Sequence, residues 1–160
     1  MYKQPLVADI IRHLQTELAN ATEAAEKAHL AAIDDQSVAE TQYDTLAIEA
    51  GYLAEGQSRR IQEFQNAIAA YRQLDLGKKS EDSAIGLGSL VQLDGDSDKG
   101  HWFFLGPAAA GYRTRIQGQD FTVITPKSPM GQALVDKYLD DEVCITLGKG
   151  EINDFIAAVY

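Results

Sequence analysis

Carboxylates gather in one stretch of this 160-residue chain where no basic side chain stands among them. Between Lys27 and Arg59 there is no lysine or arginine, but there are six acids: Asp34, Asp35, Glu40, Asp44, Glu49 and Glu55. Carboxylate oxygens are hard ligands that suit Mg²⁺, which takes one or two protein carboxylates and completes its coordination elsewhere. The stretch is therefore a candidate for sharing a metal held mainly by a partner. The simpler interpretation is a solvated acidic surface.

Two long helices are expected to carry this acidic stretch at their bend. In the first, small and apolar residues recur at alternating spacings of four and three, which is a heptad seam. The seam consists of Val7, Ile11, Leu14, Leu18, Ala21, Ala25, Ala28 and Ala32. Pro5 stands where a helix start tolerates proline. Because only alanines remain near the bend, that end buries little apolar area and is expected to be thin and weakly stabilised.

The return arm shows two apolar stripes, one of Tyr43, Leu46, Ala50 and Leu53, and one of Ile61, Phe64, Ile68 and Tyr71. Residues 34–56 are expected to form the turn of the hairpin and the start of its return arm, with Asp35 or Ser37 as the N-cap of the second helix. No basic partner four residues away is expected for the acids. Residues 1–75 are thus predicted to form an antiparallel helical-hairpin coiled coil, whose alternative role is a spacer or dimeriser.

After a polar linker at residues 76–83, the pattern changes to short apolar runs broken by Gly and Asp, as in antiparallel strands. Strands are expected at 89–93, 102–105, 112–116, 121–124, 142–147 and 154–159, with a hairpin turn at 94–98. One helix is expected with Ser128 as N-cap and Pro129 at its first position. Its apolar face would hold Met130, Ala133, Leu134 and Tyr138. Residues 76–160 therefore make the chain α+β, with a small strand-rich second domain.

Composition excludes several function classes. A formal net charge of −10 gives the chain no counterion release on DNA, so independent sequence-specific DNA binding is not expected. Cys144 is the only cysteine, expected as a buried strand residue, so no internal disulfide or multi-cysteine zinc site is possible. No run of 18 apolar residues predicts a membrane span. A cytoplasmic monomer without membrane contact is expected.

Two motifs give the sequence a resemblance to a known family. The run ITPKSPMGQALV at 124–135, followed by DDEV at 140–143, resembles a Ser-Pro-hydrophobic-x-x-Ala-Leu helix start and a Gly-Asp-x-Val strand entry. Tyr43, then Gly51-Tyr52 and Ile61, match a Tyr…Gly-Phe…Ile register. Together these resemble the Gre transcript-cleavage factors of bacteria (GreA and GreB), which are transcription elongation factors. The resemblance extends over essentially the whole chain.

The resemblance implies a partner, a site and a cofactor. The second domain would be FKBP-like and would grip RNA polymerase at the rim of its secondary channel through Ser128, Pro129 and Met130. The acidic tip would enter the channel, where Asp34, Asp35 and Glu40 would promote cleavage of backtracked RNA. Asp35 and Glu40 would help to hold a Mg²⁺ ion shared with the polymerase. Arg59 and Arg60 would lie near the RNA 3′ end. The chain would be a stimulator of the polymerase's own cleavage activity, not an enzyme.

The tip departs from the family pattern. The family carries an Asp and a Glu three residues apart, then Asn; counted back from Tyr43, those positions hold Gln36, Ala39 and Glu40. Two functions therefore stay open: a cleavage-promoting factor, and a Gre-like regulator that binds polymerase and modulates or inhibits it without cleavage. A prolyl isomerase or chaperone is a third hypothesis, and no aromatic-lined active-site motif supports it. A dimerising coiled coil is the fourth.

Overall fold

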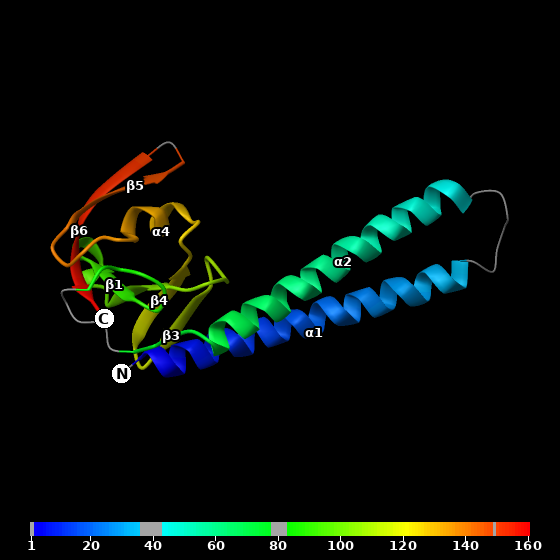
Figure 1. Ribbon diagram of the computed structural model, residues 1–160, viewed down its shortest axis with the longest axis horizontal. Coiled ribbons are helices and arrows are strands. Elements are labelled where there is room, and N and C mark those ends of the chain that lie inside the picture. Colours follow the sequence, from blue (N-terminus) through cyan, green and yellow to red (C-terminus); the bar gives the residue numbers. More distant parts are fainter. Residues whose placement is uncertain (1, 36–42, 78–82, 149) are drawn as a thin grey trace. The chain divides into compact units, whose positions relative to one another are not determined.

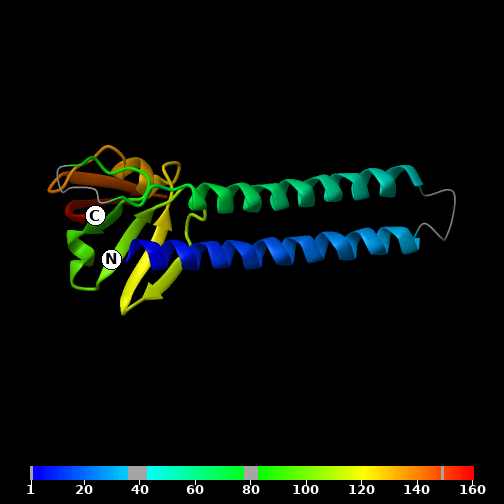
Figure 2. The ribbon, with the colours of Figure 1, turned by 60° about the horizontal axis from the view of Figure 1, so that its bottom comes forward.

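The chain folds into a helical hairpin and a mixed β-sheet that carries one packed helix (Figure 1). The computed structural model describes residues 2–35, 43–77, 83–148 and 150–160. Helix α1 spans Lys3–Asp35 and helix α2 spans Tyr43–Arg72. Figures 1 and 2 show the two helices running in opposite directions beside each other. The predicted α+β class, a helical hairpin followed by a strand-rich region, is confirmed.

The seam of the hairpin is buried near its base and becomes exposed toward the bend. Leu14 and Ile68 are buried, and Leu18, Ala21 and Ala25 are half-buried, whereas Ala28 is exposed. Burial therefore falls off where the seam contains only alanine, as expected. The return-arm stripe from Ile61 to Tyr71 is confirmed, because its four side chains are half-buried or buried.

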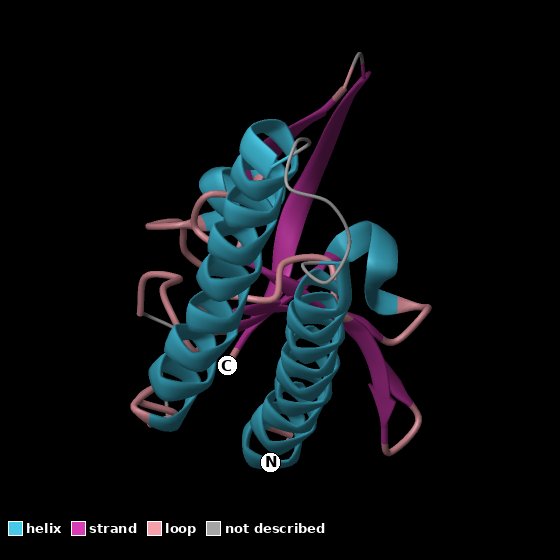
Figure 3. Cartoon of the chain, turned by 90° about the vertical axis from the view of Figure 1, so that its right-hand side faces the viewer, coloured by secondary structure: helices cyan, strands magenta, loops and turns pink. Residues whose placement is uncertain are grey.

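The prediction that Leu53 belongs to the first apolar stripe of the return arm is wrong, because its side chain is 64% exposed. Helix α2 begins at Tyr43, so Gly51 and Gly56 lie inside the helix of the return arm, as predicted. Asp35 is the last residue of α1 and not the N-cap of α2, while Ser37 lies outside the described residues. Figure 3 shows the two long helices as separate, uninterrupted rods.

Six strands form one sheet in the order β3-β4-β2-β1-β6-β5. They are β1 (Leu90–Leu93), β2 (His101–Leu105), β3 (Arg113–Ile116), β4 (Gln119–Ile124), β5 (Glu142–Leu147) and β6 (Gly150–Val159). All six predicted strands are confirmed within a few residues. Neighbours pair antiparallel except β2 and β4, which pair parallel with Phe103 opposite Thr122.

Side chains that alternate along the strands supply the core. The main buried cluster joins residues of every strand except β3 with α4 and with one residue that precedes β1: Ile85, Val91, Leu93, Phe103, Leu105, Ile124, Leu134, Val143, Ile145, Ile156 and Val159. In β5, Val143 and Ile145 face this core, so Cys144 between them faces outward. Cys144 is exposed, and the expectation that it is buried is wrong.

Two short helices lie between strands. Helix α3 (Asp94–Ser97) occupies the β1–β2 connection, where a simple hairpin turn was expected. Helix α4 (Pro129–Leu134) begins where predicted, and Leu134 is buried. It ends before Tyr138, which is 48% exposed, so the assignment of Tyr138 to its apolar face is wrong. The backbone leaves the helical conformation at Val135, whose ψ is 137°, and Asp136 follows with a positive φ of 64°.

Internal contacts divide the chain into two compact units, one of Arg12–Ala69 and one of Met1–Ile11 with Ala70–Tyr160. Within the second unit, the first turns of α1 pack on the sheet region. Leu6, Val7 and Ile10 are buried, Tyr112 Oη donates to Asp9 Oδ2 at 2.8 Å, and the Tyr2 and Phe121 rings lie 6.0 Å apart. The predicted 75/76 domain boundary stays a prediction. Among the described residues, no helix is long and apolar enough to cross a membrane.

Tyr71 is a buried polar anchor of the same unit. Its side chain is 2% exposed, and its hydroxyl donates to the Ala108 carbonyl at 2.7 Å. Burial raises the pKa of the Tyr71 phenol far above its ordinary value, because the phenolate would be desolvated. The folded unit therefore holds this group in its neutral form.

Alkaline pH is expected to weaken this unit through Tyr71. An unfolded tyrosine ionises near about pH 10, while the folded one stays neutral. The contribution of Tyr71 is thus complete below about pH 10 and falls by about 1.4 kcal/mol per pH unit above it. Urea unfolding of the wild type and Tyr71→Phe at pH 8, 10 and 11 measures this: the stability difference should shrink as pH rises. The exposed Tyr138→Phe is the control, and an unchanged Tyr71 difference at pH 11 contradicts the argument.

Candidate functional site

The predicted docking segment is a helix start whose polar groups are bound internally. Ser128 has φ −74° and ψ 153°, the extended conformation of an N-cap. Its Oγ accepts from the amides of Gly131 at 3.1 Å and Thr125 at 3.2 Å, and donates to the Thr125 carbonyl at 2.7 Å. Ser128 therefore shapes the loop between β4 and α4 and fixes where α4 begins.

The three predicted docking residues differ in what they can offer a partner. Pro129 is exposed, and as the first residue of α4 it has no N–H to satisfy. Met130 is half-buried and packs against the core cluster. Lys127, which stands just before Ser128, is exposed as well. The segment thus presents Pro129 and Lys127 outward on a base held by Ser128 and Met130.

Gly131 is the residue that lets the loop close on the helix. A Cβ at this position would overlap the Thr125 carbonyl oxygen and lie 2.7 Å from the Thr125 carbonyl carbon. Any side chain here would push the loop away from α4, because a backbone carbonyl cannot move as a flexible side chain can. In this chain, the close approach of the loop to α4 therefore requires glycine at position 131 for a steric reason.

The predicted basic pair lies on the exposed surface of α2. Arg59 Nη2 stands 3.4 Å from Glu55 Oε1, an ion pair one helical turn apart. The expectation that the acids lack a basic partner four residues away is wrong for Glu55. The Arg60 guanidinium lies over the Phe64 ring, 5.6 Å from its centroid. Both cations are exposed, and their predicted proximity to RNA stays a prediction.

The predicted acidic tip lies only in part within the described residues. The backbone of Asp34 and Asp35 forms the last turn of α1, while Glu40 lies outside the described residues. Within residues 2–35, 43–77, 83–148 and 150–160, no three His, Cys, Asp or Glu side chains are arranged to hold a metal ion. The predicted Mg²⁺ ligands Asp35 and Glu40 stay a prediction. Their carboxylate oxygens are of the chemical type that Mg²⁺ takes.

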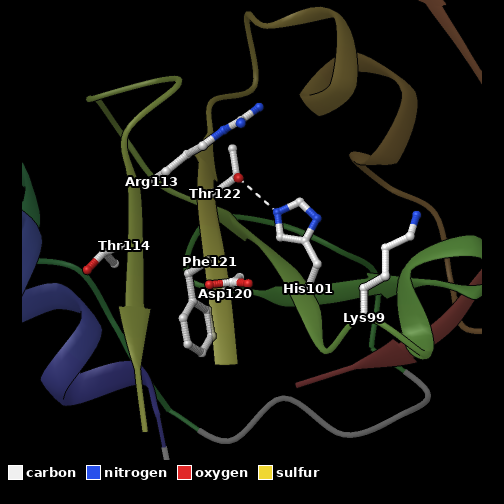
Figure 4. A pocket seen from close by; sticks show the side chains of 7 residues that line it. All are labelled: Lys99, His101, Arg113, Thr114, Asp120, Phe121 and Thr122. Atoms are coloured by element: carbon white, nitrogen blue, oxygen red, sulfur yellow. Dashed lines mark hydrogen bonds between the residues drawn. The ribbon is translucent and has the colours of Figure 1, made fainter. Parts of the chain in front are cut away.

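A polar cluster that sequence reasoning missed lies on the sheet. His101 Nε2 is 2.8 Å from Thr122 Oγ1, and His101 Nδ1 is 3.6 Å from Asp96 Oδ2. His101, Thr122 and Arg113 all line one cleft on the sheet (Figure 4). The available signal was alternation: Arg113 and Arg115 on β3, and Asp120 and Thr122 on β4, recur every second residue and so share one face. No comparable pattern in the sequence predicts the parallel pairing that brings β2 beside β4.

Comparisons with known proteins returned structural neighbours only. No protein-family model and no curated protein matches the chain. A solved structure of the transcription factor Gfh1 is 22% identical, with 94% of this chain and 92% of that chain covered and a TM-score of 0.36. GreA factor homolog 1 (Gfh1) of Thermus thermophilus is 20% identical, covering 94% of both chains with a TM-score of 0.37. Gfh1 of Thermus aquaticus is 19% identical, covering 93% and 92%, with a TM-score of 0.35.

The printed name of one neighbour, GreA factor homolog 1, includes the name of a factor that the sequence motifs resemble.

Proposed function

We propose that this chain is a Gre-like transcription elongation factor that binds RNA polymerase at the rim of its secondary channel and promotes cleavage of backtracked nascent RNA. The observation that carries the proposal is the helix start at Ser128 and Pro129. The motif that resembles the family is built here as a closed loop, braced by Ser128 Oγ and permitted by Gly131, with Pro129 exposed on it. A pre-organised, exposed loop suits a docking element.

The hairpin supports the second part of the proposal. Helix α1 has 33 residues, so at about 1.5 Å per residue it extends over about 50 Å. A slender arm of this length can carry acids into a channel, and its bend region contains Asp34, Asp35 and Glu40. Asp35 and Glu40 would each donate a carboxylate oxygen to a Mg²⁺ ion shared with the polymerase. That ion would polarise the scissile phosphate and activate water, so the chemistry belongs to the polymerase.

A second candidate is a Gre-like regulator that occupies the same channel and modulates or inhibits polymerase without cleavage. One sequence observation favours it: Gln36 and Ala39 stand where the family keeps its paired acids. Both candidates share the docking step and differ only in what the tip does.

The docking step is tested by competition. Purified protein is expected to bind RNA polymerase and to displace a cleavage-competent Gre factor from it. With the protein alone on a stalled, backtracked complex in Mg²⁺, short 3′ RNA fragments are expected. Displacement without fragments selects the second candidate. Absence of any polymerase binding rejects both.

Pro129→Ala is the sharpest probe of the docking surface. The side chain is exposed, so its removal should leave the fold intact while weakening polymerase binding by roughly tenfold, as for a residue at the centre of an interface. Pro5→Ala is the matched control, because Pro5 is likewise an exposed proline in the first turn of a helix. Equal polymerase affinity of the two variants would place the docking surface elsewhere.

A further inference from the structure

A cleft of about 470 Å³ opens on the sheet, at the end formed by β3, β4 and β2. Its volume lies within the range of roughly 300–1,000 Å³ that small-ligand sites occupy. Figure 4 shows the side chains of Arg113, Thr122, His101 and Lys99 reaching to the same side of the strands. They come from β3, β4, β2 and the turn before β2, so the cleft exists only once these strands have paired.

The cleft carries more positive than negative charge, in a chain whose net charge is −10. Lys99 and His101 share one carboxylate, that of Asp96, at 3.4 Å and 3.6 Å. Asp120 accepts two hydrogen bonds from Arg115, at 2.7 Å and 2.8 Å. The Arg115 hydrogen bonds lower the pKa of Asp120, so this carboxylate is ionised and already paired.

Neither Asp96 nor Asp120 forms an ion pair with Arg113. Among the residues that the structure describes, no hydrogen bond or ion pair satisfies its guanidinium. A guanidinium presents two parallel N–H donors that match two oxygens of an oxyanion. An anion in the cleft could therefore bind the Arg113 guanidinium on one side and the Lys99 ammonium on another.

Thr122 supplies a directed hydroxyl at the centre of the cleft. Its side chain is only 9% exposed, and its Oγ1 lies 2.8 Å from His101 Nε2. A hydroxyl both donates and accepts. When His101 carries its proton on Nε2, Thr122 accepts from it and can turn its own proton into the cleft as a neutral donor.

We propose that this cleft binds a phosphoryl group, either as inorganic phosphate or as the terminal group of a small phosphate ester. Donors from three different elements line the cleft, and a phosphoryl group offers at least three oxygens to them where a carboxylate offers two. Arg113 binds two oxygens, Lys99 provides a point charge and Thr122 donates one hydrogen bond. This site is separate from the proposed polymerase docking, and neither depends on the other.

Isothermal titration calorimetry of the full chain tests the proposal, with inorganic phosphate, pyrophosphate and acetate as probes at constant ionic strength. Pyrophosphate is expected to bind with a Kd of about 1 mM or tighter. Arg113→Gln should weaken binding by about tenfold or more, because it removes the charge-assisted fork. Lys137→Gln is the control: it removes the same charge from the residue that hydrogen-bonds Glu142, on the opposite edge strand β5.

The His101 ring gives a second readout that a general charge effect does not move. Its NMR signals should shift on phosphate addition in the wild type and in Lys137→Gln, but not in Arg113→Gln. Three outcomes overturn the proposal: no heat and no His101 shift up to about 10 mM phosphate, equal affinity of Arg113→Gln and wild type, or acetate binding as tightly as phosphate. Tighter binding of a nucleoside triphosphate than of pyrophosphate would identify a phosphate ester as the ligand source.

Discussion

Asp35→Ala and Glu40→Ala are each expected to abolish release of short 3′ RNA fragments from a backtracked polymerase complex in Mg²⁺. Each substitution removes one carboxylate from the proposed shared metal. Groups that only support a metal ligand already cost 10- to 100-fold when lost, so removal of a ligand should cost roughly a hundredfold or more. The measurement is the rate of fragment release at saturating protein, with gel separation of the RNA.

Polymerase binding must be measured together with cleavage, because a loss of docking would also abolish the release of RNA fragments. Both variants should displace a competing Gre factor as well as the wild type does. Glu26→Ala is the matched control, since Glu26 is an exposed acid of α1 well before the tip, and it should cleave normally. Unchanged cleavage in both tip variants would remove the acids from the mechanism.

Gly131→Ala is expected to destabilise the strand-rich unit by about 3 kcal/mol. In an ordinary helix position the same change stabilises, because alanine lowers the entropy cost of the helix. Here the added Cβ collides with the Thr125 carbonyl, so the loop must separate from α4 and the Ser128 cap is lost with it. The thermal midpoint of this unit should fall by roughly 12–24 °C.

Gly56→Ala is expected to change stability in the opposite direction. Gly56 lies inside α2, and no atom lies within 4 Å of the position that a Cβ would take. Alanine there should stabilise the hairpin by about 1 kcal/mol. Thermal unfolding followed by circular dichroism compares the two variants. A Gly131→Ala protein that melts at or above the wild-type midpoint would show that the Thr125 loop yields without cost.

The sequence predicted those elements whose signal is local. The strands were found because apolar and polar residues alternate between turn residues, and Ser128-Pro129 marked a helix start through capping chemistry that needs no tertiary contact. The seam from Val7 to Leu18 was found for the same reason. The loss of burial along the seam at Ala28 followed from the small size of the alanine side chain alone.

Features that depend on distant partners were harder to predict. Cys144 was expected in the core because free cysteines usually are buried, but its neighbours Val143 and Ile145 fixed the opposite alternation. Helix α4 stops early because the backbone turns at Val135 and Asp136, which residue type alone does not indicate. The cleft was missed because it needs β2 beside β4, two strands that β3 separates along the chain.

The position of β6 in the sheet has a consequence for how this protein folds. Strand β6 follows every other strand along the chain, yet it lies between β1 and β5, and Leu90 exchanges two backbone hydrogen bonds with Tyr160. Pairs so distant in sequence close slowly, because the loop entropy is lost before any contact forms. While the chain grows from its N-terminus, the helical hairpin can therefore form early, but β1 keeps an open edge until β6 has been synthesised.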